Sequence, residues 1–81
     1  MKILKFEAPW CAPCKAMDHI LELMDLNMEV EKISIDTNQE LCDQYEVRAI
    51  PTLIMIDDNK NELNRIKGFK SADEIMEFVK N

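Results

Sequence analysis

The chain carries two cysteines, Cys11 and Cys14, separated by two residues. Apolar residues recur at helical spacing from Met17 to Met24, so both cysteines lie at the start of a predicted helix. At that spacing the Cα atoms would lie about 5 to 6 Å apart, which suits a disulfide. Free backbone N–H groups and the helix dipole would stabilise a Cys11 thiolate, lowering its pKa below about 8.5. The pair predicts thiol–disulfide exchange, in which Cys11 attacks and Cys14, one turn later, resolves the mixed disulfide.

A metal site is the alternative use of such a pair. Two cysteines at this spacing can form half of a zinc site, and Cys42 and His19 are further candidate ligands. A closed tetrahedral site commonly uses two short ligand pairs, and the sequence has no second pair. The pattern therefore favours redox chemistry, and we expect no metal.

The elements that would position the cysteines follow the order β-α-β-α-β-β-α. Strands are expected at residues 2–8, 30–35, 52–57 and 62–67, with helices at residues 13–26 and 37–45 and after Ser71. Pro13 suits a first helical turn because its missing N–H costs nothing there. The segments beginning at Thr37 and Ser71 have the form of capping boxes and predict two further helix starts.

The fold class that follows is α/β. The first β-α-β segment forms a right-handed parallel unit, and the final two strands form a hairpin, which gives a four-stranded mixed sheet with helices on both faces. The length of 81 residues predicts a single domain over residues 1–81.

Composition limits the partners and the compartment. The formal net charge of −6 argues against nucleic acid and anionic membranes as partners. No stretch approaches the roughly 20 apolar residues of a membrane span, and the start of the chain lacks a secretory apolar run. Three cysteines are too few for a disulfide framework. We therefore expect a cytoplasmic protein.

Three motifs carry a resemblance to a known family. The segment from Phe6 to Lys15, FEAPWCAPCK, closely resembles the active-site segment of thioredoxins. The sequence Ile50-Pro51-Thr52 resembles their cis-proline loop, and Gly68 falls where they carry a glycine after the last strand. The chain has no counterpart of the first strand and helix of full-length thioredoxins, so it is similar to the minimal members of the family.

The resemblance implies a minimal thioredoxin-like fold and a protein disulfide reductase that carries electrons. It implies a substrate-contacting surface made of Trp10, Ala12, Pro13, Ile50, Pro51 and Gly68. Pro51 would be cis and lie against the disulfide, while the Ile50 backbone pairs with an extended substrate. Gly68 would let the substrate chain approach closely. No cofactor is implied beyond the Cys11–Cys14 disulfide.

The implied partners are protein disulfide substrates and an enzyme of the thioredoxin-reductase type, with the chain acting as a monomer. Two alternatives stay open. One is a glutathione-dependent, glutaredoxin-like oxidoreductase, although those proteins usually carry Thr-Val-Pro and a Gly-Gly-acidic segment, and this chain has one glycine. The other is a binding subunit of the same fold with idle cysteines.

One position departs from the family. Thioredoxins usually hold a buried aspartate beneath the cysteines, which helps to take the proton from the resolving thiol, and Lys5 stands there in this sequence. Lys32 matches the lysine that commonly accompanies that aspartate. Because two lysines would repel, we expect one of them to pair with Glu7, or Lys5 to extend to solvent. A sharper hypothesis is that the charge of Lys5 lowers the pKa values of the cysteines.

Overall fold

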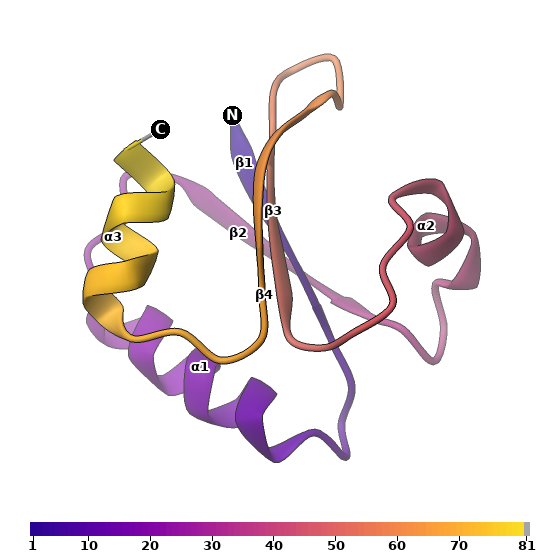
Figure 1. Ribbon diagram of the computed structural model, residues 1–81, viewed down its shortest axis with the longest axis horizontal. Helices are drawn as coiled ribbons and strands as arrows, with labels where there is room; N and C mark the ends of the chain where they lie inside the picture. The colour runs from indigo at the N-terminus through magenta and orange to yellow at the C-terminus, as the bar shows by residue number, and fades with distance from the viewer. Residues whose placement is uncertain (81) are drawn as a thin grey trace.

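The seven predicted elements are all present in the computed structural model, which describes residues 1–80. In chain order they are β1 (Lys2–Glu7), α1 (Ala12–Leu23), β2 (Glu29–Ser34), α2 (Gln39–Gln44), β3 (Thr52–Ile56), β4 (Glu62–Lys67) and α3 (Ala72–Lys80). The sheet order is β2-β1-β3-β4, in which β1 and β2 are parallel and the other two pairs are antiparallel. Helices α1 and α3 lie on one side of the sheet and α2 on the other (Figure 1). The expected four-stranded mixed sheet is confirmed.

The sheet separates two apolar cores because side chains alternate between its faces. The core beneath α1 and α3 contains Ile3, Met17, Leu53, Met55, Ile75 and Phe78. The core beneath α2 contains Leu4, Phe6, Ile33, Cys42, Tyr45, Ile54 and Ile56. Every residue of β3 is buried, as expected for a strand covered on both faces. Within residues 1–80, no helix is long and apolar enough to cross a membrane.

The start of α1 agrees with the sequence. Cys11 is its N-cap residue and Pro13 lies in the first turn. The helix ends at Leu23, three residues before the predicted end at residue 26, because Met24 takes an extended conformation with ψ 143°. The N–H of Met24 still donates to the Ile20 carbonyl oxygen at 3.1 Å. The apolar stripe therefore continues beyond the helix to Leu26, which packs against the core beneath α1 and α3.

One of the two predicted capping boxes forms. Ser71 Oγ accepts a hydrogen bond from the Glu74 backbone N–H at 3.3 Å, and Glu74 Oε1 accepts one from the Ser71 N–H at 3.1 Å. The box predicted at Thr37 is wrong, since Asn38 is the N-cap of α2 and makes no side-chain capping bond. The Asn38 amide instead donates to the Ser34 carbonyl oxygen at 2.9 Å, which ties the helix start to the end of β2.

Candidate active site

Cys11 and Cys14 form a disulfide at the N-terminal end of α1. Their Cα atoms are 5.3 Å apart, within the expected range, and both residues are buried. The Cys11 sulfur accepts a hydrogen bond from the Cys14 backbone N–H at 3.2 Å, so it takes the place of a capping oxygen. Ala12 and Pro13, between them, are exposed. The Cys11 sulfur thus lies where free N–H groups and the helix dipole favour negative charge.

The loop before β3 lies against the disulfide. Ile50 packs against the cluster formed by the two cysteines and Ala8. The peptide bond between Ile50 and Pro51 is cis, which is the geometry that the resemblance implied. The Gly68 N–H donates to the Pro51 carbonyl oxygen at 2.7 Å, so the glycine lies beside this loop. Its φ of +83° favours glycine, and the space where a side chain would begin is open.

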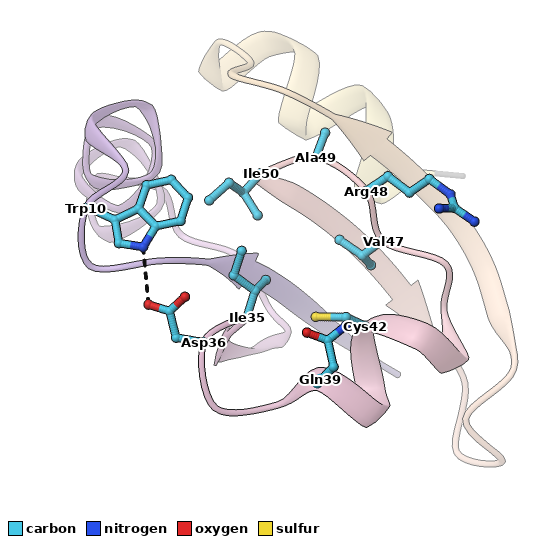
Figure 2. Close-up of a pocket in the computed structure, with 9 residues that line it drawn as sticks. All are labelled: Trp10, Ile35, Asp36, Gln39, Cys42, Val47, Arg48, Ala49 and Ile50. Atoms are coloured by element: carbon cyan, nitrogen blue, oxygen red, sulfur yellow. Dashed lines mark hydrogen bonds between the residues drawn. The ribbon is translucent and has the colours of Figure 1, made fainter.

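A groove of about 660 Å³ lies between Trp10, α2 and the loop before β3 (Figure 2). It is lined by Trp10, Ile35, Asp36, Gln39, Cys42, Val47, Arg48, Ala49 and Ile50. We call it the Trp10 groove. Ile35 and Ile50 also pack against the cysteine cluster, so the groove and the disulfide share a wall. The Trp10 side chain is 67% exposed, and its Nε1 donates to Asp36 Oδ2 at 3.2 Å.

Asp36 was missed by sequence reasoning, although a signal was available. It follows directly after the predicted second strand, and β1 and β2 are parallel neighbours. The carboxyl ends of parallel strands meet at one edge of a sheet, which is where ligands commonly bind. Trp10 and Asp36 follow those two strand ends, and their side chains meet across one end of the groove (Figure 2).

A buried cation lies beneath the sheet face that α1 covers. The Lys5 side chain is completely buried and forms ion pairs with Glu7 and Asp18. Its Nζ lies 2.9 Å from Asp18 Oδ1. The expectation that Lys5 extends to solvent is therefore wrong, and the pairing with Glu7 is confirmed. Since α1 packs over β1 on this face, the lysine has no path to water and its charge is balanced inside the protein.

Lys32 of β2 lies opposite Lys5 of β1 in the parallel register, but its side chain is in a different environment. Its side chain is 51% exposed, and its Nζ lies 3.6 Å from Asp18 Oδ2. Asp18 thus lies between the two lysines and offsets the repulsion that the sequence implied. The sequence offered a signal for Asp18, because it follows Cys14 by four residues on the same helix and shares its face.

The third cysteine, Cys42, is a buried residue of α2. Burial is the main factor that raises the pKa of the Cys42 thiol, and the neighbouring negative charge of Asp43 adds to it. Across residues 1–80, no three histidine, cysteine, aspartate or glutamate side chains gather in a way that could hold a metal ion.

Comparison with known proteins shows what this arrangement is similar to. The sequence profile of the family described as Thioredoxin matches residues 1–81. A thioredoxin of Bacillus subtilis is 38% identical over 78 residues, which cover 91% of this chain and 74% of that protein. A prophage-derived thioredoxin-like protein of the same species is 32% identical over 80 residues, covering 99% of this chain and 96% of that protein.

Solved structures give the same result. A mutant thioredoxin of Halobacterium salinarum superposes with a TM-score of 0.87 at 29% identity, covering 96% of this chain and 70% of that one. Thioredoxin 1 of Thermosipho africanus superposes with a TM-score of 0.84 at 27% identity, covering 99% of this chain and 91% of that one. The superposition extends over nearly the whole of this chain.

Proposed function

Since the chain belongs to the thioredoxin family and is a protein disulfide reductase, we propose that Cys11 is the attacking thiol and Cys14 the resolving thiol. The Cys11 thiolate attacks one sulfur of a substrate disulfide and releases the other as a thiolate. Cys14 then attacks Cys11 Sγ and displaces the remaining substrate sulfur. Two electrons pass from the cysteine pair to the substrate, which leaves the Cys11–Cys14 disulfide. The observation that carries this assignment is the Cys11 sulfur at the N-cap of α1.

The proposed substrate is an extended protein segment that crosses the disulfide beside the Ile50–Pro51 peptide bond. Its apolar side chains would enter the Trp10 groove, and its backbone would lie between Ile50 and the exposed Ala12–Pro13 turn. Gly68, hydrogen-bonded to Pro51, would border the same path. The large exposed surface of Trp10 supports this assignment, because an exposed aromatic next to a reactive sulfur suits protein docking.

The regenerating partner proposed here is a dithiol reductase of the thioredoxin-reductase type, and the protein works as a cytoplasmic monomer without a cofactor. A reducing compartment suits a chain whose close cysteine pair is catalytic and whose third cysteine is buried. The reduction potential is expected between about −270 and −200 mV, the range of thioredoxins and glutaredoxins.

Trapping tests the two sulfur roles. With Cys42 changed to serine throughout, one variant also carries Cys14→Ser and its matched control carries Cys11→Ser, so each reduced protein has a single thiol. The Cys14→Ser variant is expected to hold a peptide disulfide substrate as a mixed disulfide, seen by intact-mass spectrometry. The Cys11→Ser control is expected to react at least about tenfold more slowly, because Cys14 lies inside α1 and lacks the backbone N–H that stabilises a thiolate at the N-cap.

Equal trapping by both variants would refute the assignment of roles.

A redox titration of the cysteine pair, read by Trp10 fluorescence, tests the proposed reductase function. A two-electron transition below about −200 mV is expected for a reducing carrier. A transition near −120 mV would identify an oxidant, and turnover only with glutathione and its reductase would identify the glutaredoxin-like activity instead.

A further inference from the structure

Resolution of the mixed disulfide requires Cys14 to lose a proton, and Cys14 is almost completely buried. A free thiol has a pKa of about 8.5, so only a few per cent of it is ionised at neutral pH. Burial makes the thiolate still less favourable unless a partner takes the proton. A proton acceptor near Cys14 would therefore accelerate the second half of the reaction.

We propose that Asp18 accepts the proton of Cys14 during resolution, and that Lys5 is a positioning residue for Asp18. This inference rests on the proposed function, in which Cys14 is the resolving thiol. Asp18 follows Cys14 by four residues in α1, so their Cβ atoms lie about 5 to 6 Å apart on one helix face. Helical side chains lean toward the N-terminus, which brings the Asp18 carboxylate toward the turn that carries Cys14.

The bonding of Asp18 Oδ1 supports its use as an acceptor. The atom is buried and accepts no hydrogen bond within the part of the chain that the structure describes. Lys5 Nζ is 2.9 Å away and forms an ion pair, but its direction is not that of a hydrogen bond. Because this oxygen accepts no hydrogen bond, it has a lone pair that can take the proton of Cys14, directly or through one water molecule.

Lys5 is suited to holding this carboxylate in place. Its side chain is completely buried, and its Nζ contacts both Glu7 of β1 and Asp18 of α1. The buried positive charge stabilises the negative charge of Asp18, which an acceptor must carry before the transfer. Glu7 Oε1 accepts a hydrogen bond from Lys5, whereas Asp18 Oδ1 is a buried carboxylate oxygen that accepts none from the described residues.

The charged groups around this position come from three elements. They are Lys5 and Glu7 of β1, Lys32 of β2, and Lys15, His19 and Glu22 of α1 beside Asp18. Strand β3, Thr52–Ile56, carries no charged residue. The three α1 neighbours are exposed, so their charges are screened by water. The charges of Lys5 and Asp18 are thus the ones that interact through the low dielectric of the protein interior.

The step is balanced in atoms and electrons. The Cys14 S–H bond breaks, its proton goes to the Asp18 carboxylate, and the thiolate attacks Cys11 Sγ. The Cys11–Cys14 bond forms as the bond between Cys11 and the substrate sulfur breaks. The leaving substrate thiolate takes a proton from Asp18 or from water, which returns Asp18 to the carboxylate. The cysteine pair is oxidised by two electrons and the substrate is reduced by two.

A two-step release assay separates attack from resolution. Reduced protein with Cys42→Ser is mixed in a stopped-flow instrument with one equivalent of the aromatic disulfide dithiobis(nitrobenzoate). Attack by Cys11 releases the first coloured thiolate, and attack by Cys14 on the mixed disulfide releases the second. Asp18→Asn is expected to leave the first release unchanged within about twofold. The second release is expected to slow by about a hundredfold at neutral pH, the lower range for a general base.

The pH dependence tests proton transfer against a structural effect. With Asp18 present, the second release is expected to be nearly independent of pH between about pH 6 and 8, because the acceptor takes the proton at each pH. In the Asp18→Asn variant, whose amide cannot take the proton, the rate is expected to rise about tenfold per pH unit from about pH 6 to at least about pH 8.5, because only preformed thiolate then reacts. The matched control is Asp25→Asn, the same change at an exposed residue beyond α1, which is expected to behave like the parent.

Several outcomes would overturn the proposal. An unchanged second release in Asp18→Asn would exclude Asp18, and equal slowing of both releases would indicate a structural effect. A larger loss of resolution in Glu7→Gln than in Asp18→Asn would assign the acceptor to Glu7. If Asp18→Asn alone fails to fold, combining it with Lys5→Met removes the buried charge that Asp18 helps to offset, and the same slow, pH-dependent second release is expected. Failure of the first release in the parent would instead contradict the proposed function.

Discussion

Lys5 Nζ lies 2.9 Å from Asp18 Oδ1, and no part of the Lys5 side chain reaches the surface. The contact joins the centre of β1 to the second turn of α1, four residues after Cys14. Burying an isolated ammonium group would cost several kcal/mol, and the carboxylates of Asp18 and Glu7 offset that cost. Both carboxylate side chains keep 21% of their surface exposed, so water stabilises them in a way that it cannot stabilise the lysine.

This difference in exposure predicts that removing the two carboxylates lowers the stability more than removing the lysine. The double variant Glu7→Gln/Asp18→Asn leaves the Lys5 charge buried without a carboxylate partner, and we expect it to lower the free energy of unfolding by about 3 to 5 kcal/mol. Lys5→Met keeps most of the buried volume and leaves carboxylates that water can reach, so a loss below about 2 kcal/mol is expected. Urea denaturation of the oxidised proteins measures both values.

Lys5→Ala serves as the control for packing. It removes the charge and the alkyl chain together, and it is expected to cost more than Lys5→Met because it leaves a cavity. A larger loss in Lys5→Met than in the double variant would show that the lysine charge itself, and not its pairing, stabilises the fold.

The two helix starts that the sequence presented as equivalent should respond differently to mutation. Ser71→Ala removes the capping bond to the Glu74 N–H and is expected to cost about 1 kcal/mol of unfolding free energy. Thr37→Ala is expected to cost less than about 0.5 kcal/mol, because Thr37 does not cap α2 and is exposed. Thermal or urea unfolding of the two variants side by side would contradict this if Thr37→Ala cost as much as Ser71→Ala.

Cys42 is the single thiol of the oxidised protein, which makes its reactivity measurable. Burial raises the pKa of this thiol, and the thiolate is the species that reacts with alkylating reagents. We expect iodoacetamide to modify Cys42 in the folded, oxidised protein at least about tenfold more slowly than in denaturing urea. Since a raised pKa shifts ionisation to higher pH, the folded-state rate should still be rising above about pH 8.5. Equal rates in the two states would show that α2 does not protect the thiol.

The order and type of the elements could be predicted because the local signals agreed with one another. The apolar run of β3, the stripe that begins at Met17 and the proline of the first turn each favoured one element. The predicted strand ends differ from the observed ones by a single residue in three of the four strands and by none in β4. The α2 start failed because Asn38 and Thr37 are both good capping residues, and the choice depends on the Ser34 carbonyl oxygen, a tertiary contact.

The chemistry of the disulfide was readable from two cysteines at helical spacing, whereas its surroundings were not. Extension of Lys5 to water was one of the two expectations, because lysine usually lies at the surface and no local pattern indicates that α1 closes over it. Its partner Asp18 lies thirteen positions later in the chain. Only the packing of α1 across β1 brings the two together. Pairings between separate elements of this kind depend on the assembled fold, so a sequence can suggest candidates for them without selecting one.

Trp10 offers a way to separate docking from sulfur chemistry. Its side chain is 67% exposed at the entrance of the Trp10 groove, and its indole N–H is held by Asp36 at 3.2 Å. The groove shares Ile35 and Ile50 with the disulfide, so an extended substrate would contact the indole while its sulfur reaches Cys11. Loss of such an aromatic surface commonly costs about 1 kcal/mol or more of binding, which corresponds to roughly a fivefold or larger change in affinity.

We therefore expect Trp10→Ala to raise the KM for a protein disulfide substrate by about five- to twentyfold, with kcat changed much less, because the indole binds the substrate and does not transfer electrons. Reduction of dithiobis(nitrobenzoate), which is too small to span the groove, should change by less than about twofold. Trp10→Phe keeps an aromatic surface but loses the bond to Asp36, so an intermediate KM is expected. Equal losses with the protein and the small disulfide would mean that Trp10 acts on the reactivity of Cys11 and not on docking. In that case the indole would affect the sulfur chemistry and would not be part of the substrate-binding surface.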